Sequence, residues 1–397
     1  MSSHNYKTWV EVDKKALLNN AKIVRGLLKS GTQLMAVVKS NAYGHGLVET
    51  AKIFCGFGAD LVKSLNGDHG ASWLGVDSLD EAILLREVGI KAPILVMGYT
   101  SAERIKKSAI YDLRFTIYDS EIPKWISKNC KLETENCKLH LKIDTGMSRQ
   151  GVTLADLPKF IKKLPKGTKI EGVFTHFANA DNLHDRNYPN LQLANFKKAL
   201  EILEKSGIKP KIIHAAATAA MLTMPAPLEI ARPQGSLGAS AWARSLMGPE
   251  AQFDMVRVGI ALYGLWPSIE FAQKFDDFDL KPALSWKTRI VQIKKIKKNT
   301  PIGYGITEKV KQDSTIAILP VGYYDGYFRN LSSASEVLIG GQRCKILGRI
   351  SMNLSVADIS NVKNVQIWDE VVLIGGQNKE RITAEELAKK ADTISYE

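Results

Sequence analysis

The chain has few cysteines and no long apolar run. Only four of its 397 residues are cysteines, and no two form a C-x-x-C pair: Cys55, Cys130, Cys137 and Cys344. They therefore offer no metal site or redox dithiol, and in a reducing compartment they would remain thiols. No stretch approaches the ~18 to 20 apolar residues that span a bilayer, and the first residues have no apolar signal core. We therefore expect a cytoplasmic protein without a membrane segment.

The composition excludes two further classes of protein. Apolar residues make up 45% of the chain and charged residues 24%, as in ordinary globular enzymes rather than disordered chains. The formal net charge is +13, but the lysines are scattered over predicted helix faces and hairpins instead of forming one basic arm or helix. Nucleic-acid binding is therefore not favoured. The length of the chain predicts either two domains or one barrel with an appendage.

Strand and helix patterns alternate through the first two thirds of the chain. Eight short apolar runs read as strands: residues 35–38, 73–76, 94–97, 113–117, 139–143, 170–174, 211–214 and 255–260. Helical patterns lie before and between them, at residues 14–29, 46–54, 78–88, 119–128 and 191–205. A doubly wound open sheet would also alternate. The eightfold count and the polar residues just after strand ends favour a (β/α)₈ TIM barrel.

Beyond about residue 278 strands follow one another without helices. They are expected at residues 286–296, 314–321, 336–339, 344–359 and 365–374, with Gly-Gly turns at 340–341 and 375–376. A final helix is expected at residues 383–390, with Thr383 as cap and Glu386 completing a capping box. We therefore predict a barrel domain at residues 11–278 and a mostly β domain at 279–397, on which a strand at residues 6–10 packs. Two stretches, residues 59–70 and 224–250, look like insertions.

Lys39 stands at the end of a predicted strand, in the string AVVKSNAYGHG at residues 36–46. A lysine at that position can act as an amine nucleophile, or it can simply extend its ammonium group into water. The whole string closely resembles the pyridoxal-phosphate lysine motif of alanine racemases. The resemblance implies that Lys39 holds the cofactor as a Schiff base and that Tyr43 contacts the cofactor phosphate.

The string LKIDTGMSRQG at residues 141–151 again joins a strand end to a glycine turn. Arg149 could clamp a carboxylate through a bidentate contact, although the loop could also hold only a surface salt bridge. In alanine racemases the matching arginine binds the substrate carboxylate, and the lysine matching Lys142 is often carbamylated. A buried Lys142 beside Arg149 would suffer like-charge repulsion, which gives a physical reason for that modification. The family usually has glycine at Ser148.

Two further strand ends resemble the family closely. His176 lies in a T-H-F-A segment, where the family's histidine supports the catalytic tyrosine near the cofactor ring. Arg257 lies in VRVGIALYG and would face the pyridine nitrogen. Because a guanidinium keeps its proton, that nitrogen would stay largely unprotonated, which favours racemisation over transamination. The backbone N–H groups of Gly259 and Ile260 would bind the phosphate.

Three segments of the predicted β domain also match. Tyr304, in PIGYG, would be the second base and would reach into the barrel of a partner subunit; a tyrosine beside glycines can equally be a surface turn residue. Tyr323 would line the substrate entrance from the partner side, and the Met352 backbone would contact the substrate carboxylate. The resemblance thus implies a homodimer with shared active sites.

The chain departs from the family at several positions. Ala217-Thr218 replaces the usual Asn-Ser pair, so that Thr218 keeps a hydroxyl for the phosphate, and Asn353 replaces an aspartate. Tyr396 matches the last phosphate-contacting tyrosine of the family, but the sequence ends one residue later where the family continues.

The resemblance implies a pyridoxal-phosphate-dependent alanine racemase that supplies D-alanine for peptidoglycan by two-base proton transfer. Lys39 and Tyr304 would act on opposite faces of the substrate. Their ordinary pKa values lie near ~10, so neighbours must tune them, and for Tyr304 we expect the His176–Arg257 pair to do so. The alternatives are a racemase for serine, lysine or several amino acids, a decarboxylase of the same two-domain plan, and a non-catalytic pyridoxal-phosphate-binding protein.

Overall fold

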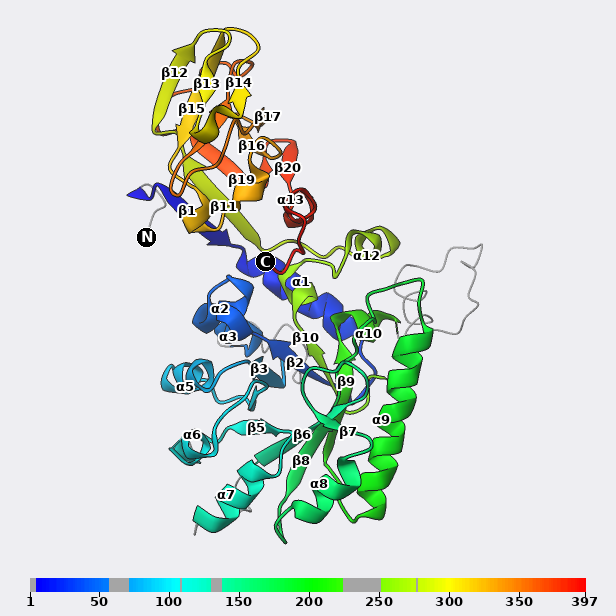
Figure 1. Ribbon diagram of the computed structural model, residues 1–397. Coiled ribbons are helices and arrows are strands. Elements are labelled where there is room, and N and C mark those ends of the chain that lie inside the picture. Colours follow the sequence, from blue (N-terminus) through cyan, green and yellow to red (C-terminus); the bar gives the residue numbers. More distant parts are fainter. Residues whose placement is uncertain (1–4, 57–70, 108, 130–137, 224–250, 276–277) are drawn as a thin grey trace. The chain divides into compact units, whose positions relative to one another are not determined.

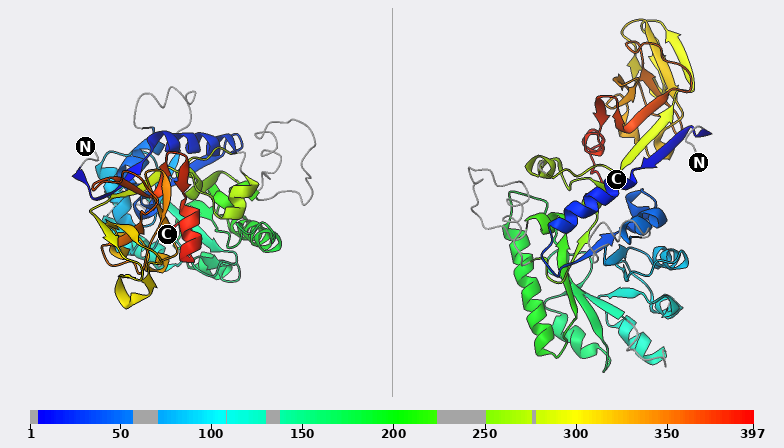
Figure 2. Two further views of the ribbon diagram at one scale, coloured as in Figure 1. Left: turned by 90° about the horizontal axis from the view of Figure 1, so that it is seen from above. Right: turned by 180° about the vertical axis from the view of Figure 1, so that it is seen from behind.

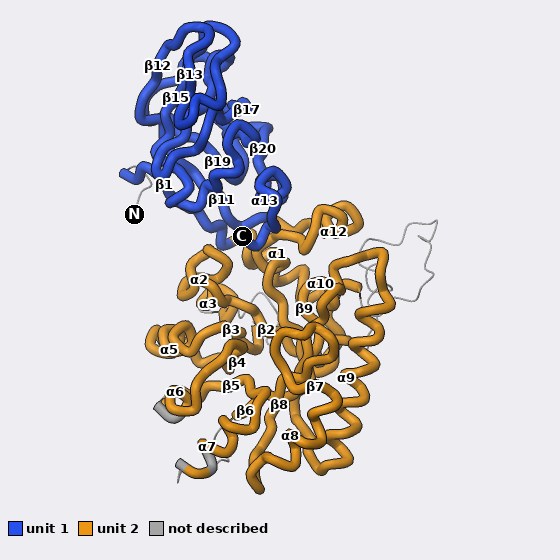
Figure 3. The backbone as a smooth tube through the Cα atoms, viewed as in Figure 1, with its two compact units in different colours: residues 1–14, 282–397 blue, residues 15–281 orange. Residues whose placement is uncertain are grey.

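The computed structural model describes residues 5–56, 71–107, 109–129, 138–223, 251–275 and 278–397. The stretches expected as insertions, residues 59–70 and 224–250, lie outside the described residues, as do Cys130 and Cys137. Cys55 and Cys344 are free thiols. The chain forms two compact units, residues 15–281 and residues 1–14 with 282–397 (Figure 3).

The larger unit is a closed barrel of parallel strands, which confirms the predicted fold class (Figure 1). The strands are paired in the order β5-β4-β3-β2-β10-β9-β8-β6, and pairing between β5 and β6 closes the ring. Their bounds are β2 (Gln33–Val37), β3 (Trp73–Val76), β4 (Ile94–Val96), β5 (Arg114–Ile117), β6 (Lys138–Asp144), β8 (Ile170–Phe174), β9 (Ile212–Ala217) and β10 (Met255–Val258). The short strand β7 (Val152–Thr153) pairs with the carboxyl end of β6.

The barrel strands read as unbroken apolar runs because both of their faces are buried. In β2 the residues from Leu34 to Val37 are all buried, although their side chains alternate between the barrel interior and the surrounding helices. Met35, Trp73, Leu95 and Met255 pack together in one interior cluster. This packed interior makes the carboxyl ends of the strands, rather than the barrel axis, available for a site.

Helices lie around the outside of the barrel (Figures 1 and 2). They are α1 (Lys14–Gly26), α3 (Leu47–Phe54), α5 (Leu79–Glu87), α6 (Ala102–Lys107), α7 (Glu121–Asn129), α8 (Leu157–Lys163), α9 (Asn187–Lys205), α10 (Thr218–Thr223) and α12 (Ile269–Lys274). Helix α9 begins four residues earlier than predicted, because Pro189 falls in its first turn, where proline is tolerated. None of the described helices is long and apolar enough to cross a membrane.

The smaller unit consists mainly of antiparallel strands. One sheet has the order β1-β11-β19-β16-β17 with β20 paired to β19, and β12-β15-β18 and β13-β14 form two smaller sheets. Their bounds are β1 (Thr8–Val12), β11 (Leu284–Arg289), β12 (Gln292–Ile296), β13 (Pro301–Ile302), β14 (Glu308–Lys309), β15 (Ser314–Leu319), β16 (Glu336–Ile339), β17 (Gln342–Lys345), β18 (Ser355–Asp358), β19 (Glu370–Gln377) and β20 (Glu380–Ile382). The first strand of the chain thus pairs with β11, more than 270 residues later.

Three predicted strands of this unit were wrong in their bounds. Residues 286–296 are divided between β11 and β12, because the chain changes sheets at Ile290, whose N–H donates to the Asp369 carbonyl. Residues 344–359 are divided between β17 and β18 by a loop, and β19 begins at Glu370 instead of residue 365. The two divisions are not visible in the apolar pattern, which continues across both breaks.

One of the two predicted glycine turns is confirmed. Gly340 and Gly341 form a two-residue hairpin between β16 and β17, with φ of 59° and 78°, as a type I′ turn requires. The other prediction was wrong, since Gly375 and Gly376 lie inside β19 and pair with β20. The turn follows at Asn378, which has φ of 56°. Asparagine tolerates this left-handed conformation better than most residues.

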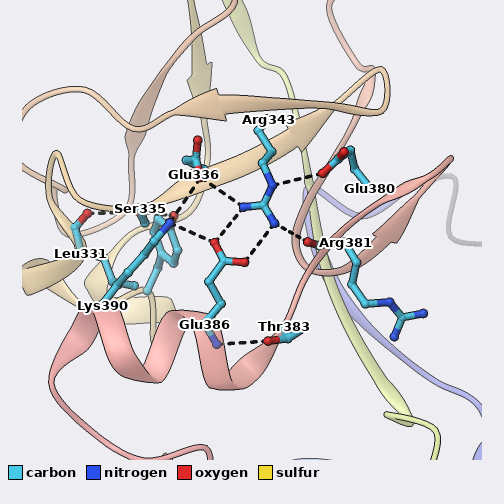
Figure 4. Close-up of polar contacts among 10 residues, drawn as sticks. Leu331, Ser335, Glu336, Arg343, Glu380, Arg381, Thr383, Glu386 and Lys390 are labelled. Carbon is cyan, nitrogen blue, oxygen red and sulfur yellow. Dashed lines mark hydrogen bonds and ion pairs between the residues drawn. The ribbon is translucent and has the colours of Figure 1, made fainter. Parts of the chain in front are cut away.

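The last helix, α13 (Ala384–Ala391), begins where predicted, and the Glu386 N–H donates to the Thr383 hydroxyl over 3.1 Å. The Glu386 carboxylate does not complete the predicted capping box. It pairs instead with Arg343 at 2.8 Å and Lys390 at 2.9 Å (Figure 4). Arg343 also contacts Glu336 and Glu380, each at 3.1 Å, so one guanidinium joins β16, β17, β20 and α13.

Candidate active site

Lys39 begins an unusual turn, α2 (Lys39–Tyr43), directly after β2. Four consecutive residues of this turn that are not glycine are left-handed: Ser40, Asn41, Ala42 and Tyr43, with φ of 53–55°. This conformation costs roughly 1–2 kcal/mol for each such residue. The turn can therefore persist only if tertiary contacts hold it.

Tyr43 brings the end of β2 close to the end of β10. Its ring packs on Tyr263 with centroids 4.7 Å apart, and the Tyr263 hydroxyl donates to the Val37 carbonyl over 2.8 Å. A Cβ atom at Gly259 would lie only 2.2 Å from the Tyr43 hydroxyl oxygen. Only glycine therefore leaves space for Tyr43 beside this backbone.

Two helix starts lie at neighbouring strand ends. Gly259 precedes the 3₁₀ helix Ile260–Tyr263 after β10, and the buried Thr218 begins α10 directly after β9. The first N–H groups of a helix lack partners within the helix and attract anions. Together with the Tyr43 hydroxyl, these groups are chemically suited to a phosphate.

Arg257, on β10, is buried and contacts groups on nearby strands and their ends. Its guanidinium donates to the Thr175 carbonyl at 2.6 Å, the Ala215 carbonyl at 2.8 Å and the His214 Nδ1 atom at 2.8 Å. The His176 Nδ1 atom lies 3.4 Å away. Burial lowers the pKa of Arg257 to about 9, which leaves the guanidinium charged at pH 7.

Arg257 determines the protonation of the histidines around it. A guanidinium can only donate, so Nδ1 of His214 and of His176 must accept, and each neutral ring carries its proton on Nε2. The His214 Nε2–H then donates to Nδ1 of His140 at 3.0 Å, and Nε2 of His140 lies 3.4 Å from the Glu171 carboxylate. The polar chain thus runs inward from the strand ends.

His176 is kept neutral at pH 7. Burial is the main cause that lowers its pKa to about 3, and the positive charges of Arg257, Arg149, Lys142 and Lys39 add to the effect. A neutral ring that accepts at Nδ1 presents an N–H donor at Nε2. It can therefore donate a hydrogen bond without adding another positive charge.

Lys142 and Arg149 lie near the same strand end but differ in exposure. Lys142 is buried and donates to the Gln150 side-chain oxygen over 3.0 Å, whereas the Arg149 side chain is exposed. Burial, followed by the charges of Arg149, Arg257 and Lys39, lowers the pKa of Lys142 to about 8. About a tenth of this amine is then unprotonated and nucleophilic at pH 7.

The loop that carries Arg149 is organised by one carboxylate. Oδ1 of Asp144 accepts from the N–H groups of Gly146, Met147 and Ser148, at 2.9 to 3.1 Å. Ser148 has φ of 56°, a conformation in which glycine is the usual residue. The serine here therefore keeps a backbone shape suited to glycine.

The remaining predicted residues belong to the β unit. Tyr304 is 68% exposed on a short 3₁₀ turn, Tyr323 is 40% exposed and Met352 is 53% exposed. The turns that carry Tyr323 and Met352 adjoin, because the Tyr323 N–H donates to the Ser351 carbonyl over 3.1 Å. Tyr396 is 43% exposed in the last turn of the chain.

The inward polar chain and the supports of the strand-end loops were not predicted from the sequence. His140, His214, Arg114 and Glu171 are polar residues on buried barrel strands, and that signal could have identified them. Glu81 and the buried Gln192 lie on helices and contact the loops through backbone and hydroxyl groups. Only the folded arrangement identifies these two.

The fold and these residues define a class: a barrel enzyme whose site lies at the carboxyl ends of the strands and carries a strong positive charge suited to small anionic molecules. Sequence models of two domains match the chain, "Alanine racemase, N-terminal domain" at residues 12–237 and "Alanine racemase, C-terminal domain" at residues 283–397. The chain belongs to the alanine racemase family, whose members are pyridoxal-phosphate-dependent isomerases.

Individual relatives match over almost the whole chain. Alanine racemases of Methanococcus maripaludis and Symbiobacterium thermophilum are each 38% identical, over 99% and 98% of this chain and 95% and 93% of their own. The crystal structure of alanine racemase from Bacillus anthracis with bound L-Ala-P is 36% identical, with a TM-score of 0.81, over 100% of this chain and 92% of that one. A Streptomyces lavendulae alanine racemase structure is 29% identical, with a TM-score of 0.81, over 98% and 93%.

Proposed function

We propose that the protein is a pyridoxal 5'-phosphate-dependent alanine racemase that interconverts L-alanine and D-alanine and supplies D-alanine for peptidoglycan. The family membership and the full-length similarity to alanine racemases support the activity. The observation that carries the proposal is the buried Arg257, which only donates and is surrounded by groups that accept from it. It suits a neutral ring nitrogen as a neighbour better than a protonated one.

The residues at the strand ends fit this cofactor. Lys39 would bind its aldehyde carbon, and Tyr43, Thr218, Gly259 and Ile260 would hold its phosphate. The close approach of Tyr43 to Gly259 and the two helix starts fit a phosphate with several donors. When bound, the cofactor withdraws electrons from the substrate and so acidifies its α-hydrogen.

Two bases from different subunits would move the α-proton. Lys39 would act on the face from which D-alanine loses its proton, and Tyr304 of a second copy on the L-alanine face. A neutral His176 that donates from Nε2 can stabilise a tyrosinate and so lower the pKa of the incoming tyrosine. We therefore propose that the His176–Arg257 pair lowers the pKa of the Tyr304 hydroxyl.

A homodimer would cover an exposed apolar surface of the β unit. Six large side chains are exposed in the three segments that predicted the shared site: Tyr304, Ile306, Tyr323, Tyr324, Met352 and Leu354. The turns of Tyr323 and Met352 adjoin, and exposed apolar groups that lie together are typical of interaction surfaces. In this proposal Tyr323 lines the substrate entrance of the partner, and Tyr396 adds a phosphate contact.

Arg149 would bind the substrate carboxylate together with the Met352 backbone, and a carbamylated Lys142 would hold Arg149 in place. The partly unprotonated Lys142 amine can attack CO₂ and form a carbamate, with loss of a proton. The new negative charge would offset the crowded cations and orient Arg149 for a bidentate contact.

A racemisation assay over a panel of amino acids tests the substrate, since the alternatives are racemases of serine, lysine or several amino acids. Turnover of alanine well above that of all other amino acids is expected.

Two variants test the catalytic residues. Lys39→Ala should abolish the absorbance of lysine-bound pyridoxal phosphate, and Tyr304→Phe should suppress α-proton exchange from L-alanine more than from D-alanine. Equal losses for the two enantiomers would contradict the two-base assignment.

Mixing two inactive variants tests the shared site. When Lys39→Ala and Tyr304→Phe dimers exchange subunits, each mixed dimer has one doubly altered site and one intact site, so that activity should return. Native mass spectrometry would verify that mixed dimers form. If they form and no activity returns, Tyr304 does not act across the interface.

A further inference from the structure

One carboxylate, that of Glu81 on α5, accepts hydrogen bonds from two separate loops of the barrel. Its Oε1 atom accepts from the N–H groups of Ser40 at 2.6 Å and Asn41 at 3.4 Å. Its Oε2 atom accepts from those of Asp77 at 2.9 Å and Ser78 at 3.1 Å. The first pair belongs to the left-handed turn after β2, and the second follows β3.

The contact with Ser78 completes a capping box, since the Ser78 hydroxyl accepts from the Glu81 N–H over 3.2 Å. A helix start of this kind needs only the Oε2 side of the carboxylate. The contacts with Ser40 and Asn41 are additional, and they reach 40 residues back along the chain. They hold the first two residues of the left-handed turn.

Lys39 precedes the left-handed residues and Tyr43 is the last of them, so the handedness of the turn determines how the two side chains are directed relative to each other. Elsewhere the turn is held by local groups, such as the Leu47 N–H that donates to the Asn41 side-chain oxygen over 2.9 Å. An ionised carboxylate forms stronger hydrogen bonds with N–H groups than a neutral acceptor does. Glu81 is therefore well suited to hold a backbone conformation that these residues rarely adopt.

We propose that Glu81 is a positioning residue that holds the left-handed turn and thereby presents Lys39 and Tyr43 to opposite ends of the same cofactor. This inference rests on the proposed function. Glu81 makes its contacts through backbone groups of Ser40 and Asn41 and does not need to touch the cofactor.

The test compares Glu81→Gln with Glu87→Gln in the full-length protein. Glu87 ends the same helix with an exposed side chain, which makes it a matched control. An amide has only one accepting atom, and a glutamine can still use it to complete the capping box with Ser78, so Glu81→Gln should release the turn at Ser40 and Asn41. We expect pyridoxal 5'-phosphate to bind Glu81→Gln about tenfold more weakly, equivalent to about 1.4 kcal/mol. Glu87→Gln should bind it like the unaltered protein.

Two further measurements separate positioning from general stability. Without cofactor, hydrogen exchange of the Ser40 and Asn41 amides should be faster in Glu81→Gln than in Glu87→Gln. Ser78→Ala weakens the same helix start but keeps the Glu81 carboxylate, so it should lower thermal stability and change cofactor affinity by less than twofold. An equal loss of affinity in Ser78→Ala and Glu81→Gln would overturn the proposal.

The outcomes distinguish this proposal from the proposed function. If the unaltered protein binds no pyridoxal 5'-phosphate, the proposed function fails. If the unaltered protein binds it and Glu81→Gln binds it equally well, only the role of Glu81 is refuted. Should Glu81→Gln not fold, Glu81→Asp replaces it; its shorter side chain keeps the charge but cannot reach both loops, and unchanged affinity there would also refute the proposal.

Discussion

Gly259→Ala should damage the phosphate end of the site through one contact. The added Cβ would lie 2.2 Å from the Tyr43 hydroxyl oxygen and 2.9 Å from its ring carbon Cζ. Since carbon contacts are normally about 3.5 Å or longer, the hydroxyl must retreat by about 1.3 Å. Tyr263, fully buried and packed on the Tyr43 ring, limits that movement.

Overpacking of this kind costs about 1–3 kcal/mol. If the cost falls on cofactor binding, pyridoxal 5'-phosphate should bind about 5- to 150-fold more weakly. Absorbance titration of the single variants Gly259→Ala and Tyr43→Phe and of the double variant measures the coupling. Tyr43→Phe removes the nearest atom of the clash, so the double variant should bind better than the product of the two single effects predicts.

Strict additivity, or unchanged affinity and unfolding free energy in Gly259→Ala, would refute the steric argument. Unchanged affinity with a loss of 1–3 kcal/mol in unfolding free energy would mean that Tyr43 does not move and that the strain remains in the fold.

Three further predictions concern charge. Burial lowers the pKa of His176 to about 3, below its unfolded value near ~6.5, so the contribution of His176 to stability should be lost as pH falls from 6.5 towards 3. The unfolding free energy of His176→Asn, measured with denaturant, should therefore depend less on pH than that of the unaltered protein. The same pH dependence in both proteins would be contrary evidence. Burial lowers the pKa of Lys142 from 10.5 to about 8, so the charged amine destabilises the fold. In CO₂-free buffer Lys142→Met should therefore raise the unfolding free energy by on the order of 3 kcal/mol below pH 8, and this gain should disappear towards pH 10.5. No gain at pH 7 would show that the buried charge costs nothing. Arg343→Met should lower the free energy of unfolding of the β unit by about 1–2 kcal/mol, because Glu336, Glu380 and Glu386 lose their common partner. The loss should be smaller in high salt. A loss that does not depend on salt would instead indicate that Arg343 contributes through packing.

The sequence alone determined the barrel, because fully buried parallel strands appear as short apolar runs that alternate with amphipathic helices. The strings around Lys39, Arg149 and Arg257 also determined the family, since each joins a strand end to a characteristic set of polar residues and glycines. Local chemistry sufficed for the hairpin at Gly340 and Gly341 and for the start of α13.

The tertiary structure decided what depends on partners distant in the chain. The left-handed turn after Lys39 contradicts the local preference of four residues, and its contact with Glu81 comes from another helix. The pairing partner changes from one sheet to another at Ile290 without any change in the apolar pattern. The lowered pKa values of Lys142 and His176 arise mainly from burial, and the positive charges of Arg257 and Lys39, which are distant from both in the chain, add to the effect of Arg149.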